Sequence, residues 1–146
     1  MTQSIARTAC LVVAYAANAS AGAWQKLPPL PESNGGFICA DWDGRVLVLG
    51  GTNWVGDEKK WLTGVHLFDP AGQRWETLKP LTQPLAHALV GSTPWGLVVA
   101  AGSTGNAPFK ALLRLEQGQV IVQDSPILDS PAVAAAGGLV GGELIV

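Results

Sequence analysis

Short apolar runs alternate with turns along this chain, and the alternation repeats. The run "RVLVLGG" (45–51) resembles "GLVVAAG" (96–102) and "GELIV" (142–146), so that apolar cores begin at Val46, Leu97 and about Glu143. A second feature, an apolar position followed by a Pro-containing stretch, recurs at Trp24, Trp75 and Val122. Both features have a spacing of about 50 residues, which predicts a repeat architecture.

Each unit predicts four short strands. In the first unit these cover 36–40, 46–49, 65–68 and 74–78, and in the second 88–92, 97–100, 111–115 and 119–122. The pair Asp43-Gly44 is a typical hairpin turn between the first two strands. A polar loop is expected over 51–61, and a third unit is expected to begin at Ala132.

Four-stranded units of about 50 residues are typical of kelch-type β-propeller blades. A lone four-stranded sheet has two apolar faces, so blades stack on each other around an axis. Gly50 and Gly51 end the second strand, where the backbone must turn steeply or take a positive φ, and Trp75 on the outer strand offers bulk to pack between blades. We therefore predict an all-β fold: an incomplete kelch-type β-propeller of about two blades and the start of a third.

The first residues differ from the rest. Arg7 precedes an apolar run over 9–17, and the small residues Ala19, Ser20 and Ala21 follow it, which is typical of a secretory signal over 1–23. The alternative is a buried strand or helix. Signal removal would leave no membrane span, and the protein would be periplasmic or secreted.

Residues 24–146 would then form the partial propeller. We expect 24–31 to be the outer strand of a closing blade, 36–84 the first blade, 85–131 the second and 132–146 the start of the third. Because a closed propeller needs more blades, we expect the chain to be a fragment whose structural partners are the remaining blades of a longer chain.

Composition excludes several classes of function. The 146 residues carry a formal charge of −2, so no electrostatic attraction to nucleic acid is expected. No H-E-x-x-H, C-x-x-C, P-loop or G-x-S-x-G pattern occurs. The two histidines stand apart from any carboxylate or thiolate cluster, so neither a metal nor another cofactor is expected. Cys39, in "GFICA", is expected to be a small buried residue.

Propeller ligands bind through loops at the mouth of the channel. The loop 51–61 offers Asn53, Trp54 and Lys60, and His87 begins the second unit. An amide, an indole and a cation suit a polyhydroxylated, carboxylated sugar. In the alternative interpretation Asn53 holds a turn, Trp54 packs, the charges are solvated and His87 is structural, as His66 is expected to be.

The stretches "GGTNW", "EKKW", "VHLFD" and "LPPLPE", together with Asp69 shortly before Trp75 in "FDPAGQRW", resemble kelch motifs. More narrowly, they resemble the N-acetylneuraminate epimerases and the related cyclically permuted sialic acid mutarotases. The resemblance implies a cofactor-free isomerase that opens and recloses the sugar hemiketal by acid–base catalysis. The Glu and Arg residues of that family lie in later blades, so no catalytic residue is assigned here.

Two other functions compete with this one. A kelch module without enzymatic activity could bind protein or glycan through its loops, because the fold hosts many functions. A kelch-type copper oxidase would need Tyr and His ligands, and the single tyrosine, Tyr15, lies in the expected signal segment.

Overall fold

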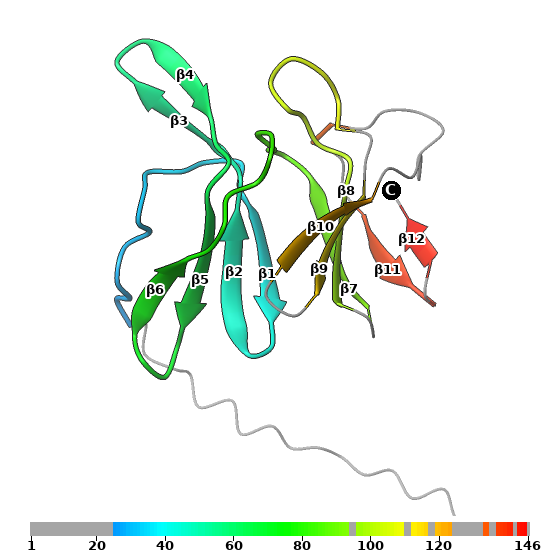
Figure 1. The fold of residues 1–146 in the computed structure, drawn as a ribbon, viewed down its shortest axis with the longest axis horizontal. Coiled ribbons are helices and arrows are strands. Elements are labelled where there is room, and N and C mark those ends of the chain that lie inside the picture. Colours follow the sequence, from blue (N-terminus) through cyan, green and yellow to red (C-terminus); the bar gives the residue numbers. More distant parts are fainter. Residues whose placement is uncertain are drawn as a thin grey trace, which may run out of the picture.

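A computed structural model describes residues 25–93, 96–109, 112–116, 119–123, 133–134, 137–141 and 143–145. The elements within these ranges are antiparallel strands (Figure 1). The expected signal over 1–23 and parts of the second and third units lie outside the described residues.

Two four-stranded sheets are present, as predicted. The first blade consists of β1 (Ile38–Trp42), β2 (Arg45–Leu49), β5 (Val65–Asp69) and β6 (Arg74–Thr77), in that spatial order. The second blade consists of β7 (Leu89–Thr93), β8 (Gly96–Ala100), β9 (Leu112–Glu116) and β10 (Gln119–Gln123). A further hairpin of β11 (Gly138–Val140) and β12 (Glu143–Ile145) follows. The eight predicted blade strands are all present, with bounds shifted by two residues or fewer.

The region expected to be a polar loop, 51–61, is instead a hairpin. Strands β3 (Thr52–Val55) and β4 (Glu58–Trp61) pair from Thr52–Trp61 to Val55–Glu58. The two residues between them, Gly56 and Asp57, make the turn, and Gly56 has a φ of 62°. A Gly-Asp pair between two short strands is a hairpin turn, so the segment expected to be a polar loop is a pair of strands.

The core lies between the two blades. Alternate residues of the first blade face inward, and they pack with residues of the second blade in one buried cluster. Its members are Ile38, Leu47, Leu49, Val65, Leu67, Leu81, Leu85, Leu97, Val99 and Phe109. The innermost strands are neighbours, since β1 contacts β7 and β7 contacts β11 (Figure 1). Successive sheets therefore lean on each other through their first strands, as propeller blades do.

A chain of backbone hydrogen bonds joins the three units just before their innermost strands. His87 N–H donates to the carbonyl of Gly36 over 2.8 Å, and Ala134 N–H donates to the carbonyl of His87 over 3.1 Å. All three residues have a positive φ, of 63° at Gly36, 57° at His87 and 53° at Ala134. The repeat therefore fixes a backbone conformation as well as a strand pattern.

The glycine pair that ends β2 fits against the start of the second blade. Gly50 has a φ of 60°, and a Cβ there would lie 1.9 Å from the carbonyl oxygen of Leu85. Gly51 has a φ of 104°, and its N–H donates to that carbonyl over 2.7 Å. In the second blade Ala101, with a φ of 62°, and Gly102, with a φ of 90°, follow β8 in the same way.

The other face of the first blade is covered in part by residues 25–34, which run beside it (Figure 1). The indole Nε1 of Trp75 donates to the carbonyl of Pro28 over 3.1 Å, and the Trp75 ring lies 5.1 Å from that of Phe68. Residues 25–30 pair with no strand among the described residues, and their role in a closing blade stays a prediction.

Cys39 is exposed, which corrects the expectation that it is buried. Strand β1 alternates, and Ile38, Ala40 and Trp42 take the side that packs in the core. Cys39 therefore points to the opposite face of the sheet, beyond the cover of the N-terminal segment.

Candidate functional site

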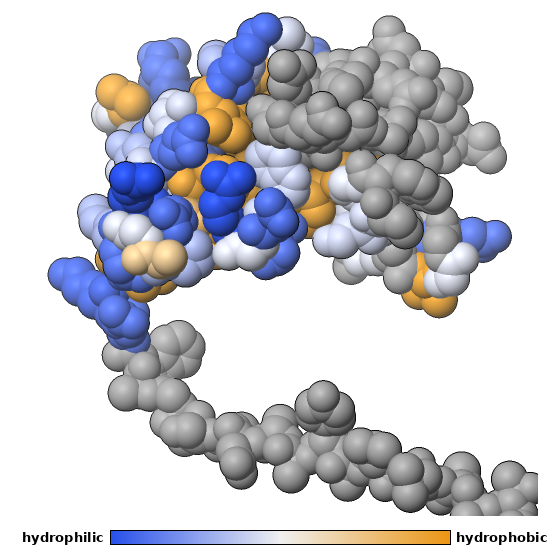
Figure 2. Space-filling view, turned by 60° about the horizontal axis from the view of Figure 1, so that its bottom comes forward, coloured by the Kyte–Doolittle hydropathy of each residue, from blue (hydrophilic) through white to orange (hydrophobic). Residues whose placement is uncertain are grey.

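The two ends of the blades differ. One end, the loop end, carries hairpin β3–β4 from the first blade and loop 101–109 from the second (Figure 1). At the opposite end the first blade has tight turns, at 43–44 and 70–73, and hydrophilic residues cover much of that blade there, with apolar residues between them (Figure 2). The predicted binding residues Asn53, Trp54, Lys60 and His87 all belong to the loop end, so the site is built there.

The register of hairpin β3–β4 sorts its side chains onto two faces. Trp54 pairs with Lys59 and Thr52 with Trp61, which places these four on one face. Asn53 pairs with Lys60, and both lie on the opposite face. The predicted set is therefore divided, because neighbouring strand residues point to opposite sides.

Trp61 is the centre of the first group. The ammonium Nζ of Lys59 lies 4.6 Å from the centroid of the Trp61 ring, a cation–π geometry. The imidazole of His87 meets the same indole edge to face, at 6.3 Å between centroids and 86° between planes. A Cβ at Gly105, in the second blade's loop, would lie 2.9 Å from the indole. Trp61 thus joins both blades at the loop end.

His87 has a strained backbone in a confined place. Its φ of 57° is rarely adopted by a residue with a side chain. Its imidazole fills the space beside Gly36, where a Cβ would lie 2.3 Å from Cε1. Among the described residues no hydrogen-bond partner meets the ring nitrogens. Strain of this kind costs about 1–3 kcal/mol and clusters at functional sites, and four other described residues with side chains also have a positive φ.

The second group is organised differently. Lys60 forms an ion pair with Glu58 on its own strand. The side-chain oxygen Oδ1 of Asn53 is buried and meets no hydrogen-bond partner among the described residues. Val55, on the same face as Asn53 and Lys60, is 61% exposed at the tip, and its neighbour Trp54, on the first face, is 66% exposed. The charge of Lys60 therefore has an acidic partner within the hairpin, whereas the ammonium of Lys59 contacts the indole of Trp61.

Sequence reasoning did not select Lys59 or Trp61 as ligand contacts. The turn Gly56-Asp57 was the available sign, because a hairpin with that turn puts Lys59 and Trp61 on one face and Lys60 on the other. Without the hairpin, no face could be assigned to either lysine.

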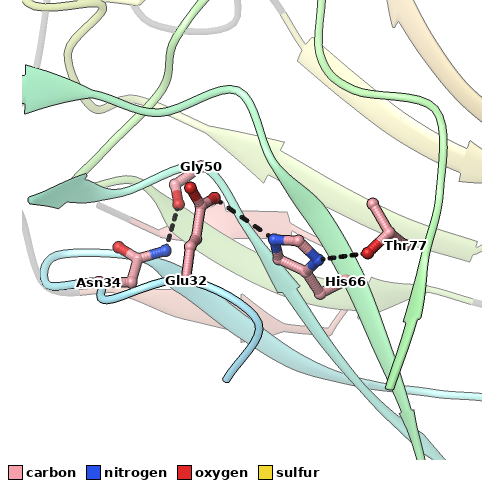
Figure 3. A network of polar contacts seen from close by, with 5 residues as sticks. All are labelled: Glu32, Asn34, Gly50, His66 and Thr77. Atoms are coloured by element: carbon pink, nitrogen blue, oxygen red, sulfur yellow. Dashed lines mark hydrogen bonds and ion pairs between the residues drawn. The ribbon is translucent and has the colours of Figure 1, made fainter. Parts of the chain in front are cut away.

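His66 belongs to a separate network on the outer half of the first blade (Figure 3). Its Nδ1 lies 3.1 Å from the hydroxyl of Thr77, and its Nε2 lies 3.3 Å from a carboxylate oxygen of Glu32. Asn34, nearby, donates from Nδ2 to the carbonyl of Gly50 over 2.7 Å. Figure 3 shows Glu32 and Asn34 reaching from the N-terminal segment toward the sheet.

The order hydroxyl, imidazole, carboxylate is that of a catalytic triad, yet the arrangement follows from packing. His66 and Thr77 are direct cross-strand partners in the β5–β6 ladder. His66 is 6% exposed, so the two nitrogens of its imidazole need partners in the protein. Gly64 leaves the space for Glu32, since a Cβ there would lie 2.4 Å from the carboxylate. The network fastens the N-terminal segment to the sheet.

Asp69 stabilises the turn between β5 and β6. Its Oδ1 accepts a hydrogen bond of 2.9 Å from the N–H of Ala71. The backbone N–H of Gly72, first, and that of Ala71 with the charge of Arg74 hold the pKa of the Asp69 carboxyl below its ordinary value of 3.8.

Among the described residues no group of three or more His, Cys, Asp or Glu side chains is placed to hold a metal ion. In the same part of the chain no helix has the length and apolar character needed to cross a membrane.

The chain matches no known protein-family model and no curated protein sequence. Among solved structures it is similar to that of YjhT, a β-propeller, with 21% sequence identity and a TM-score of 0.56. The match covers 69% of this chain and 34% of YjhT, so the chain spans about a third of the length of that neighbour. A likeness at this identity shows the fold, and the predicted all-β, incomplete propeller is confirmed.

Proposed function

We propose that this chain is part of an exported kelch-type propeller, acting in the periplasm or outside the cell, that isomerises N-acetylneuraminate or a similar sugar acid, as a mutarotase or epimerase does. Three observations support the proposal. The fold is a propeller like that of YjhT. The stretches "GGTNW" and "EKKW" resemble the sialic acid mutarotases and epimerases. The loop end gathers a cation, an indole and an imidazole, and this gathering is the observation that carries the proposal.

Mutarotation requires an enzyme only to hold the sugar in position and to transfer protons. Mutarotation removes a proton from the anomeric hydroxyl and delivers one to the ring oxygen, so the sugar itself needs no cofactor. The two described blades would contribute to binding the sugar at the mouth. The proposal assigns proton transfer to groups from other blades of the full-length protein.

The test is anomer exchange of N-acetylneuraminate, followed by NMR with the full-length protein. We expect exchange between α and β anomers to be faster than in buffer at the same pH and temperature. Heat-inactivated protein is the control for catalysis by buffer components. Exchange at the buffer rate would remove the isomerase proposal.

A second candidate is a kelch module that binds glycan or protein without catalysis. The exposed tip of hairpin β3–β4, with Trp54 and Val55 more than half exposed, favours it, because exposed aromatic side chains are frequent binding anchors. Binding of a sugar acid without accelerated exchange would select this candidate.

A further inference from the structure

We infer that Lys59 and His87, held by Trp61, bind the carboxylate of the sugar acid, and that Lys60 does not. The inference rests on the proposed function for the class of ligand, a carboxylated sugar. It assigns a binding role to residues of two neighbouring blades that meet at the loop end.

The first step is the contrast between the two lysines. They are adjacent on β4, so their side chains lie on opposite faces of the hairpin. Lys60 is paired with Glu58, which weakens its attraction for an anion. Lys59 contacts the indole of Trp61, and a cation–π contact leaves the positive charge uncompensated. Of the two lysines, Lys59 thus presents its positive charge toward the second blade.

The second step is the placement of His87. Its ring contacts the same indole as Lys59 does, so both donors lie beside Trp61. Its ring nitrogens meet no hydrogen-bond partner among the described residues, and one of them always carries a proton to donate. An ammonium and an imidazole N–H are donors that suit a carboxylate.

The third step is the cost of placing a histidine here. Gly36 occupies the corresponding place in the first unit with nearly the same φ, 63° against 57°. Glycine takes this conformation without strain, whereas a side chain costs about 1–2 kcal/mol. Ala134 takes the same conformation in the third unit, with a φ of 53°, so a side chain is accommodated at this place. What sets His87 apart is a ring whose nitrogens no described residue meets, and a ligand contact would satisfy them.

Trp61 is a positioning residue in this arrangement. The close approach of Gly105 covers part of the indole, and Lys59 and His87 contact it as well. The indole therefore orders the two donors rather than stacking on the sugar. The sugar would lie over the donors, between hairpin β3–β4 and loop 101–109.

The test compares matched lysine variants of the full-length protein. Affinity is measured by isothermal titration calorimetry for N-acetylneuraminate and for N-acetylmannosamine, a neutral sugar without the carboxylate. We expect Lys59→Gln to weaken N-acetylneuraminate binding roughly tenfold, by loss of one charged contact. We expect Lys60→Gln to change it less than about twofold, and neither variant to alter binding of the neutral sugar.

His87→Gly separates a ligand contact from a structural role. Glycine relieves the strained φ, so we expect an unfolding midpoint in urea no lower than that of the unchanged protein, together with weaker binding of N-acetylneuraminate. A lower midpoint with unchanged affinity would show that His87 serves packing alone and would overturn its assignment.

Different experimental results would contradict the inference and the proposed function. Equal effects of the two lysine variants, or no measurable binding of N-acetylneuraminate, would overturn the inference. If binding depends on Lys59 but anomer exchange is no faster than in buffer, the inference about Lys59 holds and the proposed isomerase activity is wrong.

Discussion

Gly50 and Gly51 are adjacent, yet each meets a different obstacle to a side chain. A Cβ at Gly50 would lie 1.9 Å from the Leu85 carbonyl oxygen, and one at Gly51 would lie 1.8 Å from the side-chain oxygen of Asn34. The Leu85 carbonyl belongs to rigid backbone, whereas Asn34 has a side chain that can rotate. Gly50 is therefore the position at which substitution should cost most.

We expect Gly50→Ala to lower the free energy of unfolding by more than about 2 kcal/mol, from left-handed strain plus the backbone clash. Gly44→Ala is the matched control. Gly44 has a φ of 71°, and a Cβ added there would meet no described neighbour within 4 Å, so strain alone should cost about 1 kcal/mol. Urea denaturation followed by tryptophan fluorescence measures both. Equal losses would contradict a clash at Gly50.

The sequence allowed the glycine pair to be predicted as a tight strand ending, because paired glycines between an apolar run and a polar stretch have few other uses. It did not allow the partner to be predicted, since the Leu85 carbonyl comes from the next blade. His87 shows the same limit. The repeat aligns it with Gly36, but the positive φ that makes the alignment informative is visible only in the structure.

At the scale of elements, the blade strands were predictable and hairpin β3–β4 was not. The blade strands contain runs such as Val46–Leu49, which are buried on one or both faces and are rich in β-branched residues. The hairpin contains Asp57, Glu58, Lys59 and Lys60, and this charge run conceals the alternation of its faces. A projecting hairpin buries little on its own, so its strands need no apolar pattern.

The turn between β5 and β6 gives a prediction for pH. The folded-state pKa of Asp69 is lowered, chiefly by the N–H of Gly72, so its stabilisation is present above the unfolded pKa and is lost as pH falls through the folded one. We expect the stability difference between the unchanged chain and Asp69→Asn to be largest near neutral pH and to shrink below about pH 4.

Urea titrations at a series of pH values between neutral and about pH 3 measure this difference. Glu76→Gln, a neighbouring strand residue with a weak contact of 3.9 Å to Arg45, is the control and should show little pH dependence of this kind. A difference for Asp69→Asn that stays constant with pH would contradict the role of its charge.

At the scale of the molecule, the two faces of the first blade differ in cover. The face toward the second blade is buried, and Leu47, Leu49 and Val65 on it are fully inaccessible to solvent. The other face is covered over β5 and β6 by residues 25–34, through Glu32 and Pro28, and Asn34 bonds the carbonyl of Gly50 after β2. On strand β1 this cover ends, since Cys39 is exposed although its cross-strand neighbour Val48 is buried. The arrangement makes Cys39 a reporter for anything that packs on that face.

We expect the Cys39 thiol of the folded 146-residue chain to react with Ellman's reagent at a rate within about tenfold of that in urea, because exposure and not burial governs access to the thiol. Cys10→Ser removes the other cysteine, and adding Cys39→Ser should abolish the reaction. Strong protection of Cys39 in dilute solution would contradict the exposure of its thiol.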